Sequence, residues 1–101
     1  MKEIHLSNHA EADLNDIWDW IAADNRRAAD KMVRDIVAAC RRAARFPGSG
    51  SRRPSLTAKP VRFVVVRKII LVIYAPQSKP LEIVRILHTS RDVRSLLADE
   101  P

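Results

Sequence analysis

Apolar and polar residues alternate at the start of the chain and then repeat at helical spacing. Ile4 and Leu6 fall on one face of a short strand predicted over residues 2–6. An amphipathic helix is predicted from about residue 8, where Asn8 and Glu11 are spaced like a capping box. Its apolar stripe consists of Ala10, Leu14, Ile17, Trp18 and Ile21. Asp13, Asp16 and Asp19 fall outside this stripe, so all three are expected to face away from the core.

A second helix is predicted from Arg26 to Arg45, because Asp24 and Asn25 combine a break with a helix-capping side chain. The apolar stripe of this helix consists of Ala29, Met32, Val33, Ile36, Val37, Cys40 and Ala44. The short connection predicts an antiparallel helical hairpin. Cys40 is the single cysteine, and its place on the stripe favours a small buried hydrophobic residue over a nucleophile.

The remaining pattern predicts a loop, three strands and a last short helix. Residues 47–60 form the only Gly/Pro/Ser-rich stretch and are expected to be a loop. Strands follow at residues 61–66, 69–75 and 81–88, with Arg67 and Lys68 as a tight turn between the first two. These strands are apolar on both faces, so the sheet should be covered on both sides. The last helix is expected from Arg91, with Asp92 as its cap.

The predicted order is β-α-α-β-β-β-α, which indicates an α+β fold. In this arrangement a helical hairpin packs on a mostly antiparallel four-stranded sheet. A chain of 101 residues is long enough for one core and shows no internal boundary, so residues 1–101 are predicted to be a single domain.

Charge is distributed unevenly along the chain, whose formal net charge is +6. Residues 1–40 contain five Lys/Arg and eight Asp/Glu, whereas residues 41–101 contain thirteen and four. A basic C-terminal part predicts a polyanion or an acidic protein as a partner. One cysteine excludes an internal disulfide and favours the reducing cytoplasm. The longest apolar run is far shorter than the roughly 20 residues of a membrane span, and the chain start resembles no secretory signal.

Three polar residues of the last predicted strand and the segment after it are candidates for function. Arg85 lies among aliphatic residues and needs an acidic partner from another element or a solvent-filled groove, which leaves a structural and a functional interpretation open. His88 at the strand end could serve as a general acid or base in RNA cleavage, or bond the nearby backbone. Arg91 lies at the expected helix start, where a positive charge is unfavourable, so it is expected to meet an anion or an acidic partner.

The aromatic residues divide between core and surface. Tyr74 near the end of the central strand is expected in the core with its hydroxyl at the rim, although a contact role stays open. Trp18 fits the stripe of the first helix, whereas Trp20 lies about a quarter turn away and is a candidate partner-binding anchor. No phosphate-binding loop, catalytic serine motif or metal-binding motif is present, so any catalysis is expected to need no metal or cofactor.

Several segments together resemble one protein family. They read "ADLNDIWDWIAADNRRAADKMVRDI", "ARFPGSG", "VRFVVVRKIILVIYAP" and "EIVRILHTSRDV", and they run in order over nearly the whole chain. The chain resembles the ParE branch of the ParE/RelE toxin superfamily, and the run from Ile83 to Asp92 is the most specific part of the likeness.

The resemblance implies a RelE-like fold and a bacterial cytoplasmic toxin that is neutralised by a ParD-like antitoxin. ParE-like members typically act on DNA gyrase, which would make this chain a gyrase inhibitor rather than an enzyme, with nucleic acid contacted only through the target complex. The residues expected to bind the target are Arg62, Arg67, Arg85, His88 and Arg91. Those expected to bind the antitoxin, giving a hetero-oligomer, are Trp18, Trp20, Arg52, Arg53, Tyr74 and Arg85.

Two alternatives stay open at this level. RelE-like members cut mRNA on the ribosome without a metal, and their functional positions correspond here to Arg62, Val64, Leu71, Arg91 and Leu97. Only Arg62 and Arg91 keep suitable chemistry, which weakens the nuclease interpretation. A non-toxic basic binding module would explain the charge, but no aromatic pair is set on the strands for base stacking.

Overall fold

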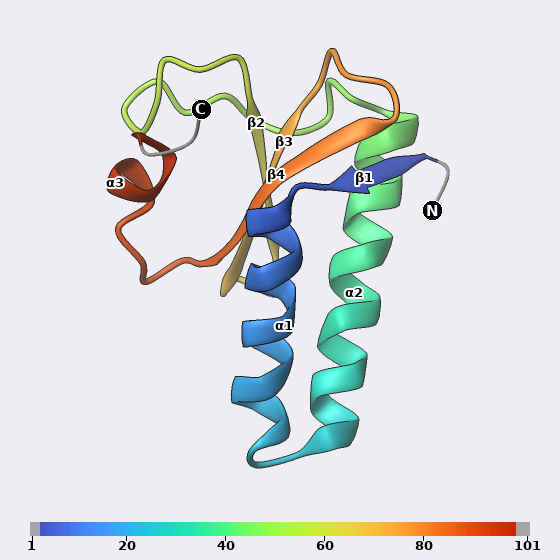
Figure 1. The fold of residues 1–101 in the computed structure, drawn as a ribbon. Helices are drawn as coiled ribbons and strands as arrows, with labels where there is room; N and C mark the ends of the chain where they lie inside the picture. Colours follow the sequence, from blue (N-terminus) through green and yellow to red (C-terminus); the bar gives the residue numbers. More distant parts are fainter. Residues whose placement is uncertain (1–2, 99–101) are drawn as a thin grey trace.

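The structure is a computed structural model of the chain, and it describes residues 3–98. The elements in chain order are β1 (Ile4–Leu6), α1 (Asn8–Ala22), α2 (Arg26–Arg45), β2 (Arg62–Val66), β3 (Ile70–Ala75), β4 (Leu81–His88) and α3 (Val93–Ala98). The predicted order and the α+β class are therefore confirmed. Figure 1 shows α1 and α2 as an antiparallel hairpin whose far end extends beyond the sheet.

The four strands form one sheet in the order β1-β4-β3-β2. β2 pairs with β3 and β3 pairs with β4, both antiparallel. β1 instead runs parallel to β4, with Ile4 opposite Leu81. The sheet is mostly antiparallel, as predicted, but the parallel edge makes it mixed.

Both faces of the sheet are covered, which confirms the prediction from the apolar strands. Along β3, Val72 and Tyr74 point into the core under the helical hairpin. Leu71 and Ile73 point into a second core on the opposite face. That second core is closed by α3 and by the loop of residues 47–60, which lie across the sheet from the hairpin (Figure 1).

The ends of the helices differ in detail from the sequence prediction. Ser7, and not Asn8, caps α1, because its Oγ accepts a hydrogen bond from the backbone N–H of Ala10 at 3.0 Å. Asn25 caps α2 as predicted, through the backbone N–H of Ala28 at 3.0 Å. α3 begins at Val93 rather than Arg91.

Asp92 caps α3, as the sequence predicted. Its carboxylate accepts from the Ser95 hydroxyl at 2.8 Å and from the Ser95 backbone N–H at 3.3 Å. These two hydrogen bonds lower the pKa of Asp92. Arg91 therefore lies just outside the helix, so the argument that the helix dipole disfavours it there does not apply.

The long loop of residues 47–60 is held by the buried side chain of Tyr74. The Tyr74 hydroxyl donates to the carbonyl of Pro47 at 2.7 Å and accepts from the backbone N–H of Gly50 at 2.9 Å. Gly50 packs so closely that an added Cβ would lie 2.6 Å from that hydroxyl. Ser51 also forms a β-bridge with Phe63. The loop is thus anchored to the sheet.

The turn between β2 and β3 contains two strained residues. Arg67 and Lys68 have φ angles of 53° and 66°, in the left-handed region that side chains with a Cβ seldom adopt. The backbone N–H of Ile69 donates to the carbonyl of Val66 at 3.2 Å, which closes a two-residue turn. Such turns normally use Asn or Gly, because both tolerate positive φ.

We therefore expect Lys68→Asn to stabilise the protein. Asn removes part of the left-handed strain, which costs about 1–2 kcal/mol for an ordinary residue, so the free energy of unfolding should rise by about 0.5–1 kcal/mol. Lys68→Ala is the matched control, since it removes the same charge and keeps the strain. Urea unfolding would measure both, and equal effects of the two variants would attribute the gain to charge.

Candidate protein-binding cleft

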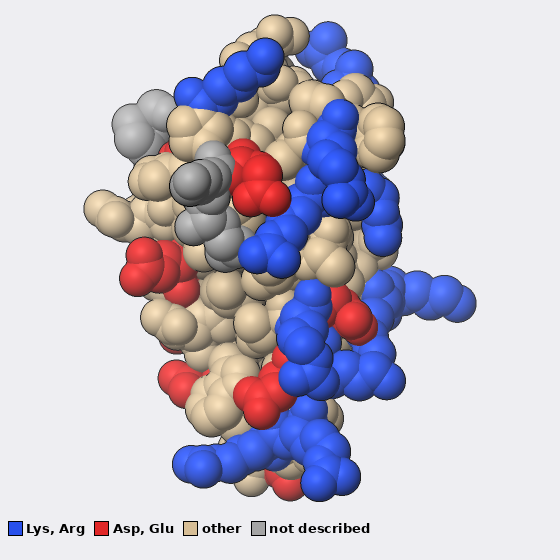
Figure 2. Space-filling model, turned by 90° about the vertical axis from the view of Figure 1, so that its right-hand side faces the viewer, with Lys and Arg blue, Asp and Glu red and all other residues tan. Residues whose placement is uncertain are grey.

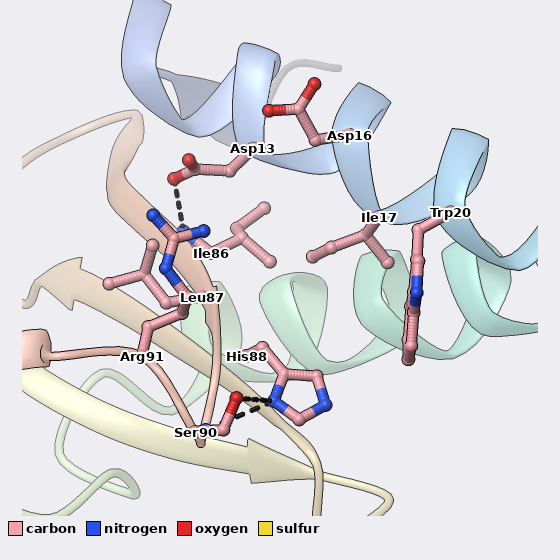
Figure 3. Close-up of a pocket in the computed structure, with 9 residues that line it drawn as sticks. All are labelled: Asp13, Asp16, Ile17, Trp20, Ile86, Leu87, His88, Ser90 and Arg91. Atoms are coloured by element: carbon pink, nitrogen blue, oxygen red, sulfur yellow. Dashed lines mark hydrogen bonds between the residues drawn. The ribbon is translucent and has the colours of Figure 1, made fainter.

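A cleft of about 400 Å³ lies between α1 and the end of β4. The α1 wall consists of Asp13, Asp16, Ile17 and Trp20, whose spacing places them on one helix face. The other wall comes from the end of β4 and the segment after it, through Ile86, Leu87, His88, Ser90 and Arg91. Figure 3 shows side chains of both walls turned towards the space between them. The walls combine aliphatic, aromatic and charged groups, as sites for protein partners commonly do.

Asp13 and Arg85 join the two walls beneath the cleft. The Arg85 guanidinium donates to the two carboxylate oxygens of Asp13 at 2.7 and 2.8 Å, and their side chains are only 12% and 11% exposed. The same carboxylate accepts from the backbone N–H of Ile86 at 3.0 Å (Figure 3). The prediction that Asp13 faces away from the core was therefore wrong. Because the guanidinium is committed to this pair, the position of Arg85 favours a structural role over a contact role.

His88 is held by its neighbour Ser90. The backbone N–H of Ser90 donates to Nδ1 of His88 at 3.1 Å, and the Ser90 hydroxyl lies 2.7 Å from the same nitrogen. An Nδ1 that accepts a backbone N–H carries no proton, so the neutral ring has its proton on Nε2. Bonding of the histidine to the nearby backbone, one of the two interpretations from sequence, is confirmed. In this tautomer neither ring nitrogen is a free base, which disfavours the general-base role, while Nε2 keeps the proton that a general acid needs.

Trp20 closes one end of the cleft and is 62% exposed. Its ring meets that of His88 edge to face, with centroids 5.7 Å apart and planes at 89°. The prediction that Trp20 lies off the core stripe at the surface is confirmed. A large exposed indole beside an apolar cleft is a typical anchor for a protein partner.

Arg91 is exposed and lies between two clefts. Besides the first cleft it lines a second one of about 600 Å³, where it is joined by Arg53 and Arg94. The guanidinium of Arg53 lies 5.6 Å from the centroid of the Phe63 ring, in a cation–π contact. Two predicted contact residues, Arg53 and Arg91, are thus brought together although they are far apart in sequence.

Other predicted residues lie elsewhere on the sheet. In the strand pairing Arg62 is opposite Tyr74, whereas His88 is opposite Ile70, so Arg62 and His88 are at opposite ends of β3. Arg62 donates to the carbonyl of Gly50 at 2.7 Å, near the exposed Arg52 in the long loop. Arg67 forms an ion pair with Asp35 of α2.

Tyr74 does not fit a direct contact with the antitoxin, and Trp18 has a partner inside the hairpin. Tyr74 is 0% exposed and both hydrogen-bonding functions of its hydroxyl are used inside the fold, so we withdraw it from the contact set. Trp18 is half-buried, and its indole N–H donates to Asp30 of α2 at 2.9 Å. It fastens the two helices of the hairpin together.

The sequence matches the family described as the ParE toxin of the type II toxin–antitoxin system parDE, over residues 4–93. The chain belongs to the ParE toxin family. A solved structure titled "Chromosomal ParDE TA system from P. aeruginosa" is similar, with a TM-score of 0.69 and 26% sequence identity. The alignment covers 87% of this chain and 96% of that one. A search of curated protein sequences finds no significant match.

Of the positions that correspond to the RelE nuclease residues, two are buried and the two retained arginines lie apart. Leu71 and Leu97 are buried in the second core, at 2% and 0% exposure. Arg62 lies four pairing positions along β3 from His88, roughly 13 Å at about 3.3 Å per residue. Arg91 follows His88 by three residues, so the two arginines are not grouped around one phosphate-sized site.

Two further features of this ParE-family chain bear on its chemistry. Within residues 3–98 no cluster of His, Cys, Asp or Glu could hold a metal ion, and no helix is long and apolar enough to cross a membrane. Burial raises the pKa of the Cys40 thiol to about 12, so the thiol is neutral and unreactive near neutral pH.

Sequence reasoning missed part of the cleft. The pattern of α1 distinguished only residues on the apolar stripe from residues outside it. The spacing i, i+3, i+4, i+7 also places four residues of the cleft on one helix face, namely Asp13, Asp16, Ile17 and Trp20. Ser90 carried no signal, because its contact with His88 depends on the local bend after β4.

Proposed function

We propose that this ParE-family chain is a cytoplasmic toxin that acts on DNA gyrase and is neutralised by a ParD-like antitoxin bound in the cleft between α1 and β4. Family membership over residues 4–93 supports the toxin role. The similar solved structure comes from a ParDE system, which supports an antitoxin partner and a hetero-oligomer.

The single observation that carries the antitoxin site is the exposed Trp20 beside an open cleft. Ile17 and Ile86 line it with apolar side chains, while Asp16 on one wall and Arg91 on the other provide opposite charges. An amphipathic segment of the antitoxin, with apolar residues facing Ile17 and Trp20, matches this surface. His88 and Arg91 are candidates for both antitoxin and target contacts, so a bound antitoxin would cover part of the target surface.

The hydrogen bonding and the positions of the candidate catalytic side chains favour a toxin that binds gyrase over one that cleaves RNA. Nδ1 of His88 accepts from the backbone, and the retained nuclease positions Arg62 and Arg91 are separated along the sheet. Arg67 and Arg91 lie on the same end of the sheet as His88, where a protein target could contact all three. This grouping follows from the pairing of Ile70 with His88 and from the bond between Thr89 N–H and the Ile69 carbonyl.

A gyrase cleavage assay tests the proposal. Purified toxin is titrated into gyrase and plasmid DNA, with and without the antitoxin from the neighbouring gene. We expect cleaved DNA to accumulate with toxin and to disappear when antitoxin is added. Arg91→Ala should weaken this effect about tenfold or more, since it removes one charged contact worth about 1–2 kcal/mol.

Two controls make the assay decisive. Lys79→Ala removes an exposed cation in the turn before β4, at the opposite end of that strand from His88, and should leave the gyrase effect unchanged. Circular dichroism would establish that each protein is folded. No effect of folded wild-type protein on supercoiling or cleavage at stoichiometric concentration would refute gyrase as the target, and cleavage of ribosome-bound mRNA would then identify the alternative.

A further inference from the structure

The outer face of α2 carries a straight row of six exposed residues, five of which are cations. Starting at residue 27, its members follow at alternating steps of four and three residues, which keeps them on one side of a helix. The row consists of Arg27, Lys31, Arg34, Ala38, Arg41 and Arg45, and all six residues are exposed. At 1.5 Å per residue the row is roughly 27 Å long. It lies opposite Ile36, which is completely buried against the sheet.

The two acidic residues of α2 do not neutralise this row, because each is engaged elsewhere. Asp30 accepts from the indole of Trp18 on α1, at 2.9 Å. Asp35 forms an ion pair with Arg67 from the turn between β2 and β3. Within residues 3–98 the five cations of the row have no acidic partner at ion-pair distance. Figure 2 shows Lys and Arg side chains gathered in a column down this side of the molecule.

The composition of the row distinguishes nucleic acid from protein as its partner. Protein–protein contacts depend on aromatic or aliphatic anchors in a desolvated centre, and the only apolar member of the row is Ala38. Four of the five cations are arginines, whose guanidinium groups bind phosphate oxygens in pairs. Duplex DNA carries one negative charge about every 1.7 Å of its axis over any length, which suits a long row of cations.

We propose that the outer face of α2 binds the phosphate backbone of duplex DNA without sequence preference. The wide major groove of B-form DNA admits one side of an α-helix, whereas the groove of A-form RNA is too narrow for it. This contact uses the side of the hairpin that packs away from the sheet, and it needs neither gyrase nor antitoxin. It therefore stands independently of the proposed function.

Binding of the full chain to a labelled 20-base-pair duplex, followed by fluorescence anisotropy between 50 and 200 mM KCl, tests the proposal. Five phosphate contacts predict a slope of log K against log salt of about −4.5, or an affinity loss of about 500-fold over this range. Arg34→Gln/Arg41→Gln removes two cations from the row, so its slope should be about −2.7 and its loss about 40-fold.

The control variant removes the same charge from the opposite side of the molecule. Arg53→Gln/Arg94→Gln changes two cations that line the cleft beside α3, and it should keep the wild-type slope. An equal drop in the salt slope for both double variants would show that DNA binding depends only on net charge, which would overturn the proposal. Tighter binding of an RNA duplex of the same sequence than of the DNA duplex would also overturn the proposal. So would a competition in which polyglutamate displaces the labelled DNA as well as unlabelled DNA does at equal charge. Circular dichroism of both variants excludes unfolding as the cause.

Discussion

Replacing Asp13 with alanine should lower the free energy of unfolding by about 3–5 kcal/mol, the usual cost of breaking a buried ion pair. The substitution leaves the guanidinium of Arg85 without its carboxylate at a site where the side chain is 12% exposed. It also removes the acceptor for the backbone N–H of Ile86. Since a domain of this size is stabilised by only about 5–15 kcal/mol, the variant should be partly unfolded near 37 °C. Urea unfolding followed by circular dichroism measures the loss.

Asp16→Ala is the matched control for this prediction. Asp16 lies on the same wall of the cleft one turn further along α1, but it is exposed and forms no ion pair within residues 3–98. Its replacement should change the free energy of unfolding by no more than about 0.5 kcal/mol. Arg85→Met combined with Asp13→Leu should recover much of the loss, because both charges then disappear together. Similar small effects of Asp13→Ala and Asp16→Ala would contradict a stabilising role of the pair.

The same pair shows where reasoning from sequence reached its limit. Because Arg85 interrupts an apolar strand, the sequence already required an acidic partner from another element or an open groove. Helical periodicity, however, separates core positions from surface positions within one helix only. It gives no information about Arg85, which lies 72 positions from Asp13 and pairs with it at the edge of the core. Asp13 lies next to Leu14 at the edge of the apolar stripe, so only the packing of α1 on β4 decided that it is enclosed.

Helix ends could be predicted from the sequence where the capping interaction involves only neighbouring residues. Asn25 begins α2 as predicted because a cap depends on residues within one turn. Ser7 was missed as the α1 cap because its hydroxyl is positioned from β4, where it also donates to the carbonyl of Val84 at 2.8 Å. The parallel pairing of β1 with β4 likewise depends on the whole topology rather than on the pattern of either strand.

The division of charge at residue 40 does not coincide with the division between the two helices. α1 has four acidic residues and no Lys or Arg, whereas α2 has seven Lys/Arg and two Asp. The helical hairpin therefore joins an acidic helix that borders the cleft to a basic helix whose outer face is free. Two different surfaces follow from this separation, one suited to a protein segment with apolar residues and one suited to phosphate.

Trp20→Ala should weaken binding of the antitoxin about 30-fold or more, because a central aromatic anchor typically contributes at least about 2 kcal/mol. Its indole is 62% exposed in the toxin alone and borders the cleft beside Ile17 and His88. Covering it with an antitoxin segment would remove a large apolar surface from water. Because the side chain contributes little to the core, the free energy of unfolding should change by less than about 1 kcal/mol.

Phe46→Ala is the control for Trp20→Ala, since Phe46 is 61% exposed and follows the end of α2, away from the cleft. Isothermal titration of each variant with the purified antitoxin would give the affinities, and Phe46→Ala should bind like the wild type. Loss of affinity in Phe46→Ala with wild-type binding of Trp20→Ala would move the antitoxin site to the end of the hairpin at Phe46. If both variants lower the antitoxin affinity only slightly and equally, exposed aromatic side chains do not determine binding. The charged groups of the two clefts would then be the basis of recognition.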